Sequence, residues 1–311
     1  MQPLIEVRHL EKSYQAKQVI QGISFEIKQG EILCLLGPNG AAKSTTINII
    51  CGALGYDSGE ILYQGKPIEK NIKGFKEKLG MVPQDLALYE DLTAEQNIRF
   101  FASLYGLKGT ALAEGIEFAL HSVGLTAHRK EKANTFSGGM KRRLNIACAI
   151  AHQPKLLIMD EPTVGIDPQS RNHILAAIRK MQKNGMTILY TTHYMEEVEE
   201  ISTRIIIMDH GKMIAEGTKE SLKALSGEKN IVIELATSTV FSLDDFYHIE
   251  GLKEVKMEKQ QLIATTIQGV ENLDKIISVL IQLNQKIQNV EIQSNNLETV
   301  FLDLTGRSLR D

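Results

Sequence analysis

The sequence contains no long hydrophobic run and no export signal. Its longest apolar runs, such as Ile146–Ala151 and Leu156–Met159, are far shorter than the ~18 to 20 residues that a membrane-spanning helix needs. The N-terminal segment from Met1 to Lys12 lacks the charged and then apolar stretch of a signal peptide. We therefore expect a cytoplasmic protein that cannot itself cross a bilayer.

The chain also lacks an excess of charge and is poor in cysteine. Its 35 basic and 38 acidic residues give a net charge of −3. A general nucleic-acid binder shows a clear basic excess, so we expect no nucleic acid among the partners. The three cysteines, Cys34, Cys51 and Cys148, stand singly inside apolar stretches. This pattern indicates buried free thiols in a reducing compartment rather than a metal site or a disulfide.

The length of 311 residues and the hydrophobic pattern predict roughly two domains of mixed α and β structure. Short alternating segments up to Tyr63 indicate an antiparallel β subdomain. Three mostly apolar segments alternate with helical ones, as expected of parallel strands buried on both faces: Ile32–Leu36, Leu156–Asp160 and Met186–Thr191. Apolar residues at helical spacing between Ala94 and Gly124 predict a helical insert at about residues 85–136.

A polar cluster at residues 226–230 marks the end of the first expected domain, residues 1–226. Strand-like segments and two amphipathic helices, near Leu273–Ile281 and Leu297–Leu304, follow it. Residues 227–311 are therefore predicted to form a small α+β domain without a catalytic cluster.

The strongest motif lies between a buried strand and the predicted helix Ser44–Cys51, and it reads Gly37, Pro38, Asn39, Gly40, Ala41, Ala42, Lys43, Ser44, Thr45. This is nearly a phosphate-binding P-loop. Backbone N–H groups at a helix N-terminus bind an anion, Lys43 can reach the β- and γ-phosphates, and Ser44 offers a hydroxyl to Mg²⁺.

Ala42 departs from this motif, because it stands where the pattern has its last glycine. With a negative φ the methyl group would only crowd the β-phosphate, whereas a positive φ would add strain of about 1 kcal/mol or more. Two outcomes stay open: an active ATPase with weakened nucleotide affinity, and a variant impaired in binding.

Two carboxylates end the apolar strand Leu156–Asp160. At the carboxyl end of a strand, Asp160 can hold the hydration shell of Mg²⁺ and Glu161 can face an attacking water. Such a pair is a weak signal alone, but beside a P-loop it forms the second half of a nucleotide site.

The segment Phe136-Ser137-Gly138-Gly139-Met140 resembles the LSGGQ signature of the ATP-binding cassette (ABC) ATPases. Other landmarks of that family follow in order over roughly residues 4–220: Tyr14 for the aromatic that stacks on adenine, Gln84 for the Q-loop, Asp167 for the D-loop and His193 for the switch histidine. From position alone Tyr14 could be a surface residue and His193 a structural one. The segment Leu297–Gly306 resembles the accessory domain of ABC-2-type exporter ATPases.

The resemblance implies a P-loop NTPase cassette with a mostly parallel core sheet, an antiparallel β subdomain and a helical insert, and it implies ATP and Mg²⁺ as cofactors. Two cassettes would pair head to tail, with each ATP between one P-loop and the signature residues Ser137, Gly138 and Gly139 of the other, near Asp167. Lys43 would stabilise charge, Glu161 would polarise the water, His193 would orient the γ-phosphate, and Ser44, Asp160 and Gln84 would meet the metal.

The same resemblance implies the partners: one or more separate transmembrane permease subunits and a second copy of this chain or a homologous cassette. The chain would be a peripheral protein on the inner face of the cell membrane and would power an exporter. The alternatives are a soluble ABC ATPase with a non-membrane partner and an ATP-binding regulatory module with little hydrolysis. The loop Pro83–Asp91, with Leu86, Leu88 and Tyr89, would either receive the membrane subunit or pack the insert.

Two charged runs have no expected role in the site. Lys141–Arg143 and Glu196–Glu197 are interpreted as solvated faces of helices.

Overall fold

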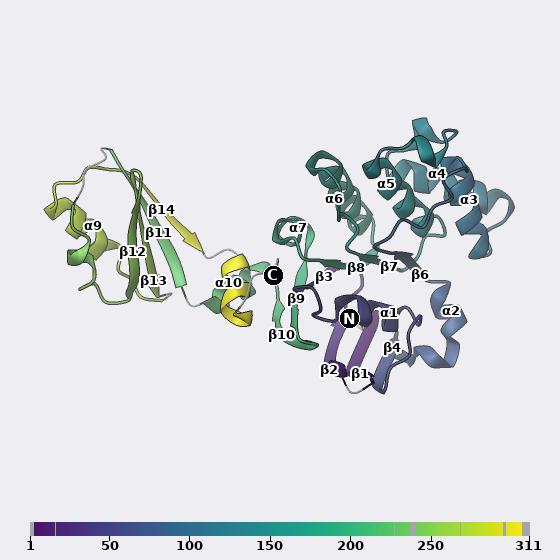
Figure 1. The fold of residues 1–311 in the computed structure, drawn as a ribbon, viewed down its shortest axis with the longest axis horizontal. Coiled ribbons are helices and arrows are strands. Elements are labelled where there is room, and N and C mark those ends of the chain that lie inside the picture. Colours follow the sequence, from purple (N-terminus) through teal and green to yellow (C-terminus); the bar gives the residue numbers. More distant parts are fainter. Residues whose placement is uncertain are drawn as a thin grey trace. The chain divides into compact units, whose positions relative to one another are not determined.

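The computed structural model describes residues 3–15, 17–226, 228–236, 241–267, 269–294 and 297–306. The chain divides into two compact units between Lys219 and Glu220 (Figure 1). This division comes a few residues before the boundary that the sequence predicts, after residue 226. Gly227 of the polar cluster is outside the described residues. Each unit has a hydrophobic core of its own.

The centre of the first unit is a six-stranded sheet with the order β10-β9-β3-β8-β7-β6. All neighbouring pairs are parallel except β9 and β10, which are antiparallel. Every residue of β3, β7 and β8 is buried, as their apolar sequences predict. The strands are β3 (Ile32–Leu36), β6 (Leu79–Val82), β7 (Leu156–Asp160), β8 (Thr187–Thr192), β9 (Arg204–Asp209) and β10 (Lys212–Gly217).

A second, antiparallel sheet of the first unit has the order β2-β1-β4-β5. The short alternating segments expected near the N-terminus include parts of two long strands that pair along most of their length. Their inward residues, such as Ile5 and Leu10, pack with α1 in the core of this unit. The strands are β1 (Ile5–Tyr14), β2 (Lys17–Ile27), β4 (Ser58–Tyr63) and β5 (Lys66–Pro67), and α1 spans Lys43–Ile50.

The helical stretch expected from Ala94 to Gly124 is two helices, α3 (Ala94–Leu104) and α4 (Gly109–Ser122). Thr93 begins α3 with a capping box, since its hydroxyl accepts from the Gln96 N–H and its own N–H donates to the Gln96 side chain. The positive φ of Gly106, +85°, helps the chain to turn between the two helices. Both helices pack against α5 (Gly138–Ile150) (Figure 1).

The remaining helices of the first unit include α6 (Pro168–Lys183) and α7 (Met195–Ile201), which flank β8 in the sequence. Shorter segments of this unit are α2 (Ile72–Lys76) and the 3₁₀ turns Ile68–Asn71, Thr126–His128 and Ala133–Thr135, whereas α8 (Lys219–Lys223) begins at its last residue and belongs mostly to the second unit. Within the described ranges, no helix combines the length and the apolarity needed to cross a membrane. The three cysteines are buried and free, as the sequence predicts.

The second unit is a four-stranded antiparallel sheet with the order β12-β13-β11-β14. Ile276 and Leu280 of the amphipathic helix α9 are fully buried in its core with Ile231, Ile233 and Leu262. This α+β arrangement agrees with the predicted fold class. Its elements are β11 (Glu228–Leu235), β12 (Leu252–Glu258), β13 (Gln261–Ile267), α9 (Leu273–Gln282), β14 (Ile287–Ser294), α10 (Leu297–Thr305) and the 3₁₀ turns Ala224–Ser226 and Asp244–Phe246.

Candidate functional site

A cavity of about 190 Å³ lies between the P-loop, the end of β7 and Gln84. Its wall joins residues from widely separated parts of the chain: Asn39, Gly40, Ala42, Lys43, Ser44, Thr45, Gln84 and Glu161. A larger cavity of about 810 Å³, beside α2 and β5, is lined by none of the motif residues. The smaller cavity is therefore the candidate site, because the phosphate-binding chemistry converges there.

Lys43 is the first residue of α1, and its side chain is buried against the P-loop. Its Nζ donates to the carbonyl oxygens of Gly37 at 2.7 Å and Pro38 at 3.1 Å. Nζ also lies 3.5 Å from Oε1 of Glu161. Burial lowers the pKa of Lys43, and the neighbouring Glu161 carboxylate opposes that shift.

Ala42 has a φ of +78° and a ψ of +17°, in the left-handed region. The sign of φ at Ala42, which the sequence left open, is therefore positive. An alanine in this conformation carries strain of about 1 kcal/mol relative to glycine. Its methyl group is buried and belongs to the core around α1. The effect on nucleotide affinity stays a prediction.

Asp160, the last residue of β7, faces two hydroxyl groups. Its Oδ1 accepts from Ser44 Oγ at 3.2 Å and from Thr191 Oγ1 at 2.6 Å. The hydroxyl of Ser44 and the carboxylate of Asp160 are hard oxygen donors, and Mg²⁺ prefers such ligands when phosphates and waters complete its shell. The residues present therefore fit a magnesium ion shared with a nucleotide.

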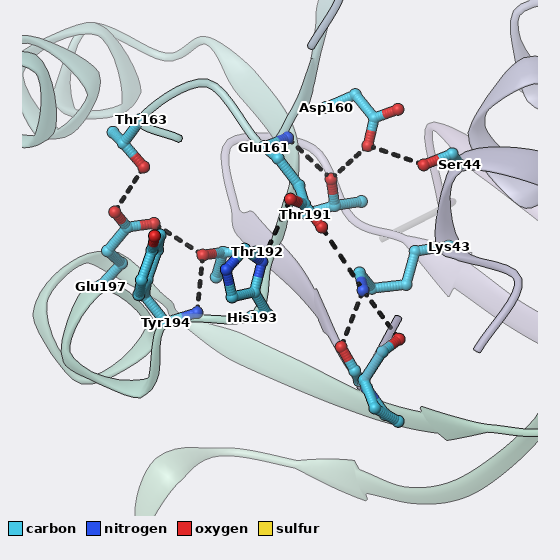
Figure 2. A network of polar contacts seen from close by, with 12 residues as sticks. Lys43, Ser44, Asp160, Glu161, Thr163, Thr191, Thr192, His193, Tyr194 and Glu197 are labelled. Atoms are coloured by element: carbon cyan, nitrogen blue, oxygen red, sulfur yellow. Dashed lines mark hydrogen bonds and ion pairs between the residues drawn. The ribbon is translucent and has the colours of Figure 1, made fainter. Parts of the chain in front are cut away.

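Glu161 follows β7 directly and has a φ of +44°. Its N–H lies 3.0 Å from Thr191 Oγ1 and 3.2 Å from the Thr191 carbonyl oxygen, and these bonds hold the turn. The buried carboxylate points between two side chains: Oε1 toward Lys43, and Oε2 toward His193, whose Nδ1 is 3.1 Å away (Figure 2). A water bound near this carboxylate would have a base beside it and two nitrogen groups close by.

Residues 20–164 of the chain match the family described as ABC transporter. The linearmycin resistance ATP-binding protein LnrL of Bacillus subtilis is 43% identical over 316 aligned residues, which cover 99% of this chain and all of LnrL. The chain belongs to the ABC transporter family. It is an ATP-binding protein of that family and an ATPase.

Two further comparisons agree with this assignment. The Nod factor export ATP-binding protein I of Paraburkholderia xenovorans is 34% identical over 99% of this ABC cassette protein and 98% of its own length. The structure of cbiO1 from Clostridium perfringens, part of the ABC transporter complex cbiONQ, matches with a TM-score of 0.67 and 31% identity, over 72% of this chain and 92% of cbiO1.

Gln84 is exposed and lines the cavity. Tyr14, Ser137 and Asp167, which the sequence also predicts as site residues, do not line it. Tyr14 ends β1 and is exposed, with the Nζ of Lys12 5.6 Å from its ring centre. Ser137 caps α5 by accepting from the Met140 N–H at 3.3 Å. Asp167 caps α6 in the same way, by accepting from the Ser170 N–H at 2.9 Å. Each cap fixes the start of its helix.

Gly139 of the signature packs against the first turn of α6. A Cβ atom at this position would lie 2.2 Å from Ser170 Oγ, so only glycine lets α5 approach α6 this closely. The first turns of the two helices are therefore held together within one cassette.

The interpretation of Lys141–Arg143 as a solvated face is wrong for Arg142, which is buried. Its Nη1 donates to the carbonyl oxygens of Pro83 at 3.2 Å and Gln84 at 2.8 Å. Burial lowers the pKa of Arg142. The signal in the sequence was its position four residues before the buried Ile146, on the apolar side of α5.

The interpretation of Glu196–Glu197 as an exposed run is wrong for Glu197, which is fully buried, whereas Glu196 is exposed. The carboxylate of Glu197 accepts hydrogen bonds from the hydroxyls of Thr163, Tyr190 and Thr192. Its position four residues before the buried Ile201 was the available signal, because residues at that spacing share a helix face.

Proposed function

We propose that this cassette is the ATP-hydrolysing subunit of a membrane exporter whose transmembrane part is a separate chain. LnrL and the Nod factor export protein are named for resistance and export, and both match almost the whole chain, the second unit included. A membrane partner would hold the cassette on the inner face of the cell membrane. The observation that carries the ATPase role is the convergence of Lys43, Ser44 and Glu161 on one cavity, with Asp160 bonded to the Ser44 hydroxyl.

The proposed roles of the site residues follow from these contacts. Lys43 would exchange the carbonyls of Gly37 and Pro38 for β- and γ-phosphate oxygens, which carry more charge. Ser44, Asp160 and Gln84 would hold Mg²⁺, which neutralises charge on the phosphates when bound.

Glu161 would accept a hydrogen bond from the water whose oxygen attacks the γ-phosphorus in line, as the bond to the ADP oxygen breaks. His193 lies on the far side of this carboxylate from Lys43 and would orient both Glu161 and the γ-phosphate. The P-loop N–H groups from Gly37 to Thr45 would bind the β-phosphate, and Tyr14 would stack on adenine.

A second cassette would complete the site. Ser137, Gly138 and Asp167 are exposed, although they do not line the cavity of their own chain. Each cap leaves backbone N–H groups at a helix N-terminus, where a phosphate is favoured. Head-to-tail pairing would bring these residues to the ATP of the partner cassette, and it explains why they lie apart from Lys43 in one chain.

The membrane partner would contact apolar side chains that this cassette leaves exposed between β6 and α4. Tyr89 and Leu104 are 49% and 68% exposed, and Leu86 and Phe100 lie nearby in the sequence with exposed side chains too. The ring of Tyr89 packs on Phe100, with 4.8 Å between centroids, so the surface is preformed. Exposed apolar groups of this size are typical of interaction sites.

Co-purification tests the exporter role. The chain would be expressed alone and together with a polytopic membrane protein encoded by a neighbouring gene. We expect recovery in the membrane fraction only from co-expression, with ATP hydrolysis in the recovered complex. A cassette that hydrolyses ATP but stays out of the membrane fraction in both cases would contradict the exporter role and favour a non-membrane partner.

A further inference from the structure

Glu197 is a fully buried carboxylate on α7, four residues after His193. Its Oε1 accepts from the Thr163 hydroxyl, and its Oε2 accepts from Tyr190 at 2.8 Å and Thr192 at 2.7 Å. Among the described residues no lysine, arginine or histidine forms an ion pair with it. Three hydroxyl groups therefore replace water around this carboxylate, and Figure 2 shows two of them, those of Thr163 and Thr192.

The hydroxyls belong to the two segments that carry the candidate catalytic side chains. Thr163 lies two residues after Glu161, on the way to Asp167. Thr192 directly precedes His193, and its Oγ1 also accepts from the Tyr194 N–H at 2.9 Å. The Thr192 hydroxyl therefore makes two hydrogen bonds, one to Glu197 and one from the Tyr194 N–H. Together they fix the backbone before and after His193.

We infer that Glu197 is a positioning residue for ATP hydrolysis, which joins the segment after Glu161 to the segment that bears His193. This inference rests on the roles proposed above for those two residues. Thr191 already ties the near ends of β7 and β8 through Asp160 and the Glu161 N–H. Glu197 supplies the second tie beyond the strand ends, through Thr163.

The charge of Glu197 gives this tie its strength. Hydrogen bonds from hydroxyls to a carboxylate are shorter and stronger than those between neutral groups. A buried carboxylate without a cation is costly, and an apolar side chain would fill the same space at lower cost. A carboxylate at position 197 is accounted for if its role is to hold Thr163 and Thr192 at a fixed distance from each other.

The test compares Glu197→Leu and Glu197→Gln with the matched control Glu196→Leu, on the exposed side of the same helix. Glu197→Leu removes all three acceptor contacts, and we expect kcat for ATP to fall at least tenfold with KM changed by less than twofold. Glu197→Gln keeps the shape and the hydrogen-bonding capacity of the side chain but not its charge, so it should recover only part of the kcat that Glu197→Leu loses. Glu196→Leu should leave both constants unchanged.

A double variant separates positioning from general damage. If Glu197 acts through His193, adding Glu197→Leu to His193→Ala should lower kcat by less than twofold further. An undiminished loss in that background, a parallel rise in KM, or normal kcat in Glu197→Leu would each overturn the inference. If Glu197→Leu does not fold, Thr163→Val and Thr192→Val take its place, each expected to lower kcat severalfold at constant KM.

The reference variant Glu161→Gln keeps this test apart from the proposed function. If Glu161→Gln hydrolyses ATP normally, the proposed catalytic site is wrong whatever Glu197 does. If Glu161→Gln is inactive and Glu197→Leu is normal, only the present inference fails.

Discussion

The carboxylate of Glu161 lies 3.1 Å from Nδ1 of His193, although the two residues are 32 positions apart in the sequence. The reason is the parallel pairing of β7 and β8, in which Asp160 lies opposite Thr191. Each side chain comes just after the last paired residues of its strand. The contact therefore depends on strand register, and a shift of one residue would turn these side chains to opposite faces.

Replacing Glu161 with Gln should leave ATP binding intact and slow hydrolysis by a factor on the order of 10² or more. The amide keeps the shape of the carboxylate and a contact with His193 but cannot take up a proton from water. Single-turnover hydrolysis measures the effect, and size-exclusion chromatography with ATP should show a stable dimer. Near-normal turnover in Glu161→Gln would contradict the assignment of Glu161 as the catalytic base.

Replacing Ala42 with Gly should tighten ATP binding on the order of fivefold with little change in the free energy of unfolding. Relief of about 1 kcal/mol of strain at the positive φ is offset by about 0.8 kcal/mol from the lost burial of one methyl group. The gain in affinity comes from the backbone freedom of glycine, which lets the P-loop N–H groups close on the β-phosphate.

A paired titration of both proteins with ATP and Mg²⁺, together with urea unfolding, measures these effects. Unchanged affinity would show that the methyl group is harmless. Binding and turnover that arise only in Ala42→Gly would instead make Ala42 an inactivating residue.

Charged replacements at Tyr89, which is exposed, and at Leu88, which is half-buried in the same loop, should uncouple transport while the isolated cassette keeps its ATPase activity. Tyr89→Glu and Leu88→Glu test this prediction, and Leu104→Glu adds the most exposed position of the group. Ile214→Glu, at an exposed apolar residue of β10, is the matched control. A large drop in melting temperature for the Tyr89 and Leu88 variants would favour packing of the insert over docking.

His152 should make the cassette lose stability on mild acidification. Its ring stacks on Tyr105 at 3.6 Å, and its Nε2 lies 3.0 Å from the Leu79 carbonyl oxygen. Burial lowers the pKa of His152 to about 4. Between pH 6.5 and 4, His152 therefore binds a proton in the unfolded chain but not in the folded chain. The free energy of unfolding then falls as the pH falls.

The expected loss from His152 is about 1 to 2 kcal/mol at pH 5, the lower end allowing for solvent near a partly buried ring. Urea unfolding at pH 7.5 and pH 5 should show a smaller drop for His152→Gln than for the unmodified chain. The exposed His173→Gln serves as the control and should follow the unmodified chain. An equal drop in all three proteins would contradict the prediction.

Much of the site was readable from the sequence because its chemistry is local. The P-loop joins Gly37 to Thr45 without a gap, and β3 is apolar because it is covered on both faces. The same holds for β7 and the acids that end it. Ser137 and Asp167 belong to residue types that favour the start of a helix, and each caps the helix that follows it.

Other features depend on contacts between distant segments. The burial of Arg142 and Glu197 depends on what packs against α5 and α7, and a local pattern of charges resembles a solvated face in either case. The break between α3 and α4 lies within a continuous helical spacing of apolar residues, and the turn at Gly106 interrupts it.

The sequence by itself determined the α/β cassette, its P-loop and the residue types of the candidate site, because hydrophobic period and contiguous motifs are properties of the chain alone. Only the tertiary structure decided the positive φ of Ala42, the contact between Glu161 and His193, and the buried bonds of Glu197. These depend on how β3, β7 and β8 lie side by side, which is set by long-range packing and not by any local stretch of residues.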